Sequence, residues 1–236
     1  TIYCMQELSV IIICKNEAHI VHNVIKSVLQ LTDDIIVADT GSRDNTIAVA
    51  KQAGARIAQL PWQGFGPTKN NAIAQAKYDW ILSLDADEII DGPLLNELLQ
   101  LNLNNTHYVY NLRFRNFLGN KALRFGEWGN DKHIRLFNRT VVQWNDAFVH
   151  EQLNLPADAK KILLNGFVLH KTAEHLQDYI AKLIVYADLN ARKYSKQGKS
   201  SGKLITVIRP LVNFIQNYFF RLGFLDGYTG FVVARA

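Results

Sequence analysis

Residues 80–89 read WILSLDADEI, an apolar run that leads directly into three carboxylates, Asp85, Asp87 and Glu88. Unpaired carboxylates are costly to bury, so we expect these acids at the edge of a sheet and not inside it. In open α/β sheets the carboxyl edge is where ligands bind. The stretch therefore predicts a buried strand that ends at a ligand site.

Short apolar runs alternate with helix-like stretches over the first third of the chain. The runs are 8–14, 35–39, 56–60 and 80–84, and the stretches between them are 18–30, 43–53 and 67–77. Such alternation is typical of βαβ units, in which helices cover both faces of a parallel sheet. The sequence therefore predicts an α/β fold.

Two later regions of the chain differ in residue pattern from the first third. From His107 onward, longer strands over 107–117 and 133–138 are rich in aromatic and basic residues, which predicts a mixed-sheet half. From Thr172 apolar residues recur at helical spacing, and 204–224 is apolar on nearly every side. Pro210 and Gly223 are expected to bound a short helix in this last segment.

The composition predicts a cytoplasmic protein. The chain has 236 residues, 48% of them hydrophobic, and its two cysteines, Cys4 and Cys14, form no disulfide framework, which favours a reducing compartment. The apolar run 8–14 follows Glu7, lacks the features of a signal peptide and is too short to span a bilayer.

The net charge of +5 is unevenly placed. Residues 190–236 hold eight Lys or Arg and one acid, Asp226, which is +7 and leaves −2 for the rest. A basic tail suggests an anionic partner, and we expect the surface of an anionic membrane. A solvated helix face is the alternative. A nucleic-acid partner is not expected, because no recognised nucleic-acid motif accompanies the charge.

Asp85 and Asp87 are the candidate metal ligands. Two acids at i and i+2 can face the same side of an extended chain, and Mg²⁺ and Mn²⁺ take such oxygen ligands together with substrate phosphates. The alternative is a solvated acidic turn that caps a helix beginning near Pro93.

Two other predicted strands also end in polar residues. Asp39 closes one strand before the turn of Gly41 and Ser42, and Lys15 and Glu17 follow the first strand. Turn amides and helix N-termini attract phosphate, while Asp39 can accept a hydrogen bond from a base or ribose. A role for Asp39 in the turn alone is the alternative.

Four segments together resemble family 2 glycosyltransferases with the GT-A fold: IIICKNE (11–17), IIVADTGSRDNT (35–46), PWQGFGPTKNNAIAQA (61–76) and WILSLDADE (80–88). Later segments, HIRLFNR (133–139), FVHEQL (148–153) and FFRLGFLDGYTGF (219–231), resemble bacterial lipopolysaccharide core glucosyltransferases that act on inner-core heptose. The resemblance implies a UDP-sugar donor and a divalent metal. It implies that Glu17 and Asp39 contact uridine, that Lys69 or Asn70 approaches the nucleotide, and that Asp85 and Asp87 hold ribose and the metal diphosphate.

The catalytic base is less clearly marked. Many members of the family carry a Glu-Asp pair where this chain has His150 and Glu151. A carboxylate that takes the proton of the acceptor hydroxyl would suffice for an inverting displacement. Glu151 is the first candidate, followed by Glu127 and Asp131, and an ion pair is the alternative role for Glu151. His150 and His170 are candidate metal ligands or, alternatively, packed core residues.

The resemblance implies an inverting transferase that moves glucose from UDP-glucose to a lipid-linked saccharide, with inner-core heptose of lipopolysaccharide as the expected acceptor, at the inner face of the bacterial cytoplasmic membrane. Residues 1–171 are expected to form the catalytic domain, with a donor half over 8–104 and an acceptor half over 105–171, and residues 172–236 a helical, membrane-facing extension. Transfer to another surface glycan, a metal-dependent nucleotidyltransferase, and a non-enzymatic membrane- or nucleic-acid-binding module remain alternatives.

Overall fold

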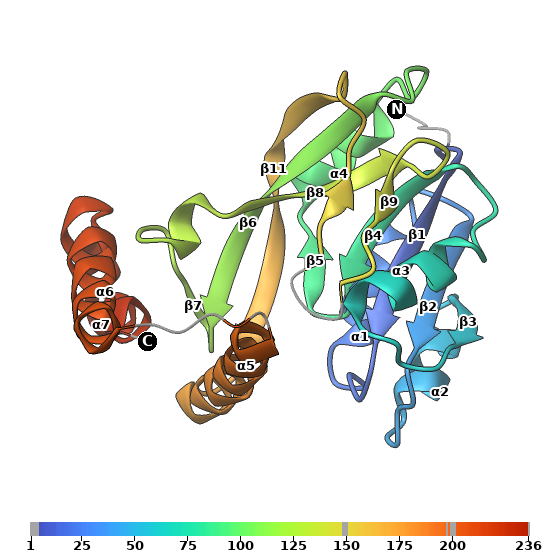
Figure 1. Ribbon diagram of the computed structural model, residues 1–236. Coiled ribbons are helices and arrows are strands. Elements are labelled where there is room, and N and C mark those ends of the chain that lie inside the picture. The colour runs from blue at the N-terminus through green and yellow to red at the C-terminus, as the bar shows by residue number, and fades with distance from the viewer. Residues whose placement is uncertain (1–4, 148–150, 197, 199–201, 236) are drawn as a thin grey trace. The chain divides into compact units, whose positions relative to one another are not determined.

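The computed structural model describes residues 5–147, 151–196, 198 and 202–235 (Figure 1). The chain forms two compact units. The first consists of Thr1–Arg113 and Lys132–Val168, and the second of Phe114–Asp131 and Leu169–Ala236.

Four parallel strands in the order β3-β2-β1-β4 form one half of the first unit (Figure 1). They are β1 (Leu8–Cys14), β2 (Asp34–Asp39), β3 (Arg56–Gln59) and β4 (Trp80–Asp85). Every residue of β1 and β2 is buried, as is usual for parallel strands covered on both faces. The predicted α/β class is confirmed.

The register of these strands places two predicted site residues at one edge. Cys14 of β1 pairs with Asp39 of β2, and Ile13 pairs with Asp85 of β4. Asp39 and Asp85 therefore end their strands on either side of β1, at the carboxyl edge of the sheet.

Helices connect the parallel strands. They are α1 (Val21–Val28), α2 (Thr46–Gln52), α3 (Phe65–Ile73) and, after β4, α4 (Gly92–Leu99). Helix α1 buries one apolar stripe at spacings of three and four residues, formed by Val21, Val24, Ile25 and Val28. Asp91 caps α4 by accepting a hydrogen bond from the amide of Leu94 at 2.8 Å.

The mixed half of the sheet continues from β4. Strand β8 (Lys132–Asn138) pairs antiparallel with β4, and β6 (Tyr108–Leu118) pairs antiparallel with β8. Next in the sheet are β11 (Lys160–Ala173) and β5 (Glu88–Ile90), while β9 (Gln143–Trp144) and β10 (Leu153–Asn154) form a separate antiparallel pair. This half matches the mixed sheet predicted from His107 onward.

The second unit contains the ends of β6 and β11 and most of the remaining helices. Its other elements are β7 (Lys121–Ala122), η1 (Trp128–Asn130), α5 (Leu176–Lys196), α6 (Lys203–Ile215), η2 (Gln216–Phe220), η3 (Gly223–Asp226) and α7 (Gly227–Arg235). The functional division predicted at residue 171 stays a prediction. Of the helices that the structure describes, none has the length and hydropathy required to cross a bilayer.

The expectation that Pro210 bounds a short helix is wrong. Pro210 lies inside α6, which runs from Lys203 to Ile215. A proline in a helix removes one backbone N–H, but this does not stop the helix from continuing when the residues on both sides favour it.

Candidate active site

The loops that follow β1 and β2 are tied to each other. The hydroxyl oxygen of Ser42 accepts a hydrogen bond from the amide of Asn16 at 2.8 Å, and Asn16 Oδ1 accepts one from the amide of Arg43 at 2.8 Å. The hydroxyl of Thr46 accepts a hydrogen bond from the amide of Glu17, also at 2.8 Å. These hydrogen bonds therefore fix the loops after β1 and β2 relative to each other.

Asp39 shapes the turn after β2. Its buried carboxylate accepts hydrogen bonds from the amides of Gly41 at 3.0 Å and Ser42 at 3.1 Å. Gly41 has a φ of 97°, in the region that favours glycine. The turn role that the sequence left open is thus present, and a contact between Asp39 and a nucleoside stays a prediction. Lys15, at the end of β1, is exposed.

This edge of the sheet is electronegative. Burial, together with the carboxylates of Glu17, Asp39 and Asp44, raises the pKa of the Cys14 thiol to about 12. Three acids close to one thiol favour ligands that offer N–H and O–H donors. The edge therefore suits the base and ribose of a nucleotide better than its phosphates.

Lys69 of α3 is a buried cation held by two acids. Its side chain is 2% exposed, and its Nζ lies 2.7 Å from Glu151 Oε1 and 3.4 Å from Asp85 Oδ1. The same ammonium lies 4.6 Å from the centre of the Trp144 ring. A buried charge is tolerated only when it is paired, so these partners hold Lys69 at the site.

Arg135 of β8 holds the other side of Asp85. Its Nη2 lies 3.3 Å from Asp85 Oδ2, its Nε donates to Glu88 Oε2 at 2.9 Å, and Nη2 also donates to Glu88 Oε1. Burial acts to lower the pKa of Arg135, but the carboxylates of Glu88 and Asp85 outweigh it and raise that pKa. Arg135 therefore stays charged beside Asp85.

The five side chains form what we call the charge cluster. Its members are Lys69, Asp85, Glu88, Arg135 and Glu151. They come from α3, β4, β5, β8 and the segment after residue 150, and all lie in the first unit. Two cations and three carboxylates thus meet at the carboxyl end of β4.

Asp85 and Asp87 fit the requirements of a divalent metal. Asp85 ends β4 and Asp87 lies in the turn that follows, and carboxylate oxygens are the donors that Mg²⁺ and Mn²⁺ prefer. Within the described ranges, no three His, Cys, Asp or Glu side chains gather as a complete metal site. Mg²⁺ is usually held by one or two carboxylates and substrate phosphates, so the pair suits a metal that binds together with a diphosphate.

Asn70 has a structural role next to Lys69. Its side-chain amide donates to the carbonyl of Trp144 at 2.9 Å and accepts from the amide of Trp144 at 3.1 Å. Gly66, in the same helix, lies so close to the following loop that a Cβ would meet the Asn145 carbonyl oxygen at 1.9 Å. These contacts fix α3 against β9. A contact of Asn70 with the nucleotide stays a prediction.

A pocket of about 550 Å³ adjoins the charge cluster in the first unit. Glu151 and Arg135 both line it, together with Trp144, Gln152 and Lys161. A ligand in this pocket would therefore reach the carboxylate that the sequence marks as the first candidate base.

The remaining candidates lie elsewhere in the chain. Glu127, Asp131 and His170 belong to the second unit. There the side-chain amide of Asn116 donates to Asp131 Oδ2 at 3.1 Å, and Asn116 Oδ1 lies 2.7 Å from His170 Nδ1. Their roles as bases or metal ligands stay predictions. His150 lies outside the described residues.

Sequence reasoning assigned no role to Arg135 or Glu88. Both residues are buried, and each neutralises the other. A signal was present for Arg135, because an arginine in the middle of the apolar strand 133–138 requires a buried acid nearby. The sequence did not show which acid this was.

Comparison with known proteins identifies the class. The sequence profile described as glycosyl transferase family 2 matches residues 9–152, and the chain belongs to this family. An uncharacterized glycosyltransferase of Rickettsia typhi is 29% identical over 239 residues, covering 97% of this chain and 82% of the relative. The lipopolysaccharide core biosynthesis glycosyltransferase LpsC of Rhizobium meliloti is 27% identical over 234 residues, covering 96% and 86%.

The chain is also similar to proteins of known structure. Glucosyl-3-phosphoglycerate synthase from Mycobacterium tuberculosis, in complex with Mn²⁺, UDP and glucosyl-3-phosphoglycerate, is 25% identical with a TM-score of 0.38 and covers 47% of this chain and 44% of its own. TarS 1-349 of S. aureus is 13% identical with a TM-score of 0.49 and covers 71% and 61%.

Family membership decides between the classes that the sequence left open. The chain is a glycosyltransferase. Family membership therefore supports the transferase prediction and gives no support to the nucleotidyltransferase or to the non-enzymatic module. The parallel sheet with its mixed continuation agrees with the predicted GT-A type of fold.

Proposed function

We propose that this glycosyltransferase transfers glucose from UDP-glucose, with inversion, to an inner-core heptose of lipopolysaccharide. The observation that carries the chemistry is the charge cluster at the end of β4. Similarity to LpsC supports an acceptor from the lipopolysaccharide core. The choice of UDP-glucose rests on the resemblance of the four donor-half motifs.

The donor would bind along the carboxyl edge of the sheet. The carboxylates of Glu17 and Asp39 would accept hydrogen bonds from the N–H and O–H groups of uridine at this edge. The turn of Gly41 and Ser42 borders the same edge. Lys69 and Arg135 supply positive charge beside Asp85, where the diphosphate would lie.

Asp85 and Asp87 would hold the divalent metal. When bound there, the metal neutralises negative charge on the departing diphosphate. The cations Lys69 and Arg135 act in the same direction, because they are already fixed next to Asp85 and need little reorganisation.

Glu151 would act as the base. It takes the proton of the acceptor hydroxyl while the hydroxyl oxygen attacks the anomeric carbon of glucose, the bond from that carbon to the diphosphate breaks, and UDP leaves. In the structure Glu151 pairs with Lys69 at 2.7 Å. A protonated carboxyl no longer attracts this ammonium, so Lys69 can then turn to the charge that develops on the diphosphate.

The lipid anchor of the acceptor would bring the enzyme to the cytoplasmic face of the membrane. Helix α6 and the segment after it expose large apolar side chains, among them Leu211, Phe219, Phe220 and Tyr228. Arg209 and Arg221 are exposed in the same region. Apolar side chains flanked by basic groups favour contact with an anionic lipid surface.

A donor screen tests the proposal. Heptose-containing lipopolysaccharide core is incubated with UDP-glucose, UDP-galactose or GDP-mannose, and released nucleoside diphosphate is measured. We expect UDP-glucose alone to be consumed, EDTA to abolish the reaction and Mn²⁺ or Mg²⁺ to restore it.

Asp87→Ala should lower kcat by roughly 10² or more, because leaving-group stabilisation is lost.

The matched control for this substitution is Asp79→Ala, which removes an exposed acid just before β4. Full activity of Asp87→Ala with unchanged metal dependence would refute the metal assignment. Consumption of UDP-glucose only with a different surface glycan would replace the proposed acceptor.

A further inference from the structure

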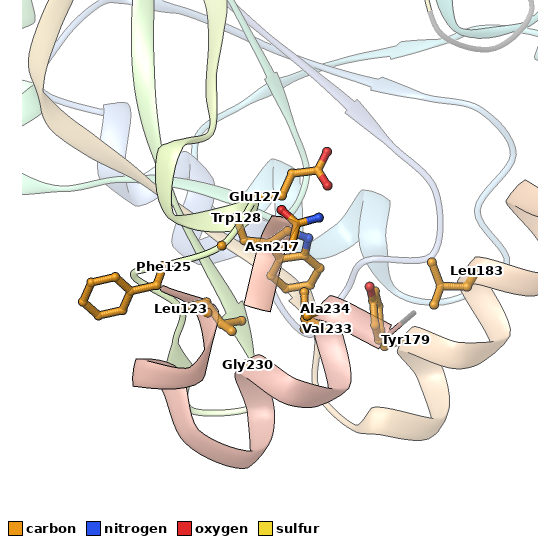
Figure 2. A pocket seen from close by; sticks show the side chains of 12 residues that line it. Leu123, Phe125, Glu127, Trp128, Tyr179, Leu183, Asn217, Gly230, Val233 and Ala234 are labelled. Atoms are coloured by element: carbon orange, nitrogen blue, oxygen red, sulfur yellow. The ribbon is translucent and has the colours of Figure 1, made fainter. Parts of the chain in front are cut away.

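A second pocket lies entirely within the second unit (Figure 2). Its volume is about 250 Å³, and it is built from the loop 123–128, from α5 and from the segment 217–234. Glu127, Trp128, Tyr179 and Asn217 supply its polar groups, while Leu183 and Val233 are among its apolar lining residues.

The polar groups of this pocket are available to a ligand. Within the described part of the chain, the carboxylate of Glu127, the indole N–H of Trp128 and the hydroxyl of Tyr179 make no hydrogen bond. Asn217 Oδ1 accepts from Arg221 at 3.1 Å, which leaves its side-chain N–H groups to the pocket. Figure 2 shows Glu127, Trp128 and Asn217 gathered beside one another.

Two aromatic rings complete the wall. The rings of Trp128 and Tyr179 meet edge to face, with centroids 5.3 Å apart and planes at 84°. Burial raises the pKa of Tyr179, and the carboxylate of Glu127 raises it further, which places Glu127 close to the phenol. Rings, neutral donors and one carboxylate acceptor therefore surround a single space.

The segment FFRLGFLDGYTGF, which the catalytic chemistry does not use, builds this pocket. The buried carboxylate of Asp226 accepts hydrogen bonds from the amides of Arg124 and Phe125, both at 2.9 Å. These bonds fix the loop that carries Glu127 and Trp128. Gly230 approaches Gly223 so closely that a Cβ would lie 2.0 Å from the Gly223 carbonyl oxygen.

The charge of the lining selects the class of ligand. Of the described residues that line the pocket, Glu127 alone is charged, so phosphate is disfavoured and a neutral ligand rich in hydroxyl groups is favoured. A sugar ring offers hydroxyl groups to the polar side chains and a C–H face to the aromatic rings. The volume lies just below the roughly 300 Å³ at which pockets for drug-sized ligands begin, which suits one sugar ring.

We propose that this pocket binds one uncharged sugar residue of the acceptor saccharide. The inference rests on the proposed function, since it assigns the acceptor a second point of attachment in addition to the reacting hydroxyl. Asp226 is then a positioning residue for the loop that carries Glu127 and Trp128.

The test measures saccharide binding to the full chain without donor. The probe is a deacylated and dephosphorylated heptose oligosaccharide, and its Kd is measured by titration calorimetry. Glu127→Gln and Tyr179→Phe should each raise this Kd about tenfold, because the first replaces a charged hydrogen-bond acceptor with a weaker neutral one and the second removes a hydroxyl that bonds the sugar. Glu174→Gln, which changes an exposed carboxylate of the same unit outside the pocket, should leave the Kd unchanged.

The Kd for UDP with Mn²⁺ is measured on every variant and shows that the first unit is intact. Unchanged oligosaccharide affinity in both pocket variants, or no binding of the probe by the wild-type protein, would overturn the inference. The proposed function is judged separately by consumption of UDP-glucose. If no donor is consumed but the two variants still weaken binding of the probe, the proposed function fails and the saccharide pocket stands.

Discussion

Lys69 is the residue on which the charge cluster depends. Lys69→Met keeps the length of the side chain but leaves Glu151 and Asp85 without their shared cation. Breaking a buried pair costs about 3–5 kcal/mol, and we expect about 3 kcal/mol because Asp85 is 37% exposed and water compensates in part. The free energy of unfolding in urea measures this loss.

The control for Lys69 is an ion pair of similar length on the surface. Lys77 and Asp33 lie 2.6 Å apart with both side chains 52% exposed, so Lys77→Met should change stability little. Equal effects of the two substitutions would contradict the view that burial makes the Lys69 pairs strong.

Glu151 is tested by a substitution that keeps size and hydrogen bonding. Glu151→Gln should lower kcat by roughly 10² or more while the affinity for UDP-glucose is largely kept, because only the basicity is lost. Steady-state kinetics with both substrates measures this, with the exposed Glu7→Gln as the control. A rise confined to the acceptor KM would instead make Glu151 a binding residue.

At the level of elements, the position of α3 decides where Lys69 lies. Gly66→Ala would place a Cβ 1.9 Å from the Asn145 carbonyl oxygen, so α3 or the loop must move. Overpacking of this kind costs about 1–3 kcal/mol. We also expect a loss of kcat, since Lys69 moves with the helix, and thermal unfolding together with kinetics measures both effects.

Gly92→Ala is the matched control in another helix. No atom lies within 4 Å of a Cβ added at Gly92, so this variant should be as stable as the wild type or more so by up to about 1 kcal/mol. If Gly66→Ala behaves like Gly92→Ala, close contact between α3 and the loop is not what fixes Lys69.

The elements of the donor half were predictable because their signals are local. The strand predicted at 80–84 and the acids after it correspond to β4 and its turn, and the periodicity after Thr172 corresponds to α5. The contact of Arg135 with Asp85 and Glu88 was not predictable, because it depends on antiparallel pairing of β8 with β4 across about fifty intervening residues. The Lys69 to Glu151 pair escaped prediction for the same reason.

At the level of the whole molecule, the uneven charge leads to a prediction about membranes. A variant with Gln in place of five basic residues of the tail should bind acidic vesicles roughly 10³-fold less well, since each of the five basic groups contributes on the order of 1 kcal/mol. The substituted residues are Lys196, Lys199, Lys203, Arg209 and Arg221. Co-sedimentation at low and high salt measures the binding.

A control variant of equal net charge carries Gln at five basic residues outside the tail. These are Lys26, Lys51, Lys77, Arg113 and Lys160. Equal loss of binding in both variants would indicate a general charge effect and not a membrane-facing tail.

Cys14, buried at the centre of the sheet edge, gives the protein a chemical reporter. Its pKa of about 12, against an ordinary 9.0, makes the thiolate about a thousandfold scarcer than in a free cysteine. Alkylating reagents attack the thiolate, so they modify Cys14 only when β1 leaves the sheet. In a Cys4→Ser background, the labelling rate of this single thiol would record how often this edge of the sheet opens in the native protein.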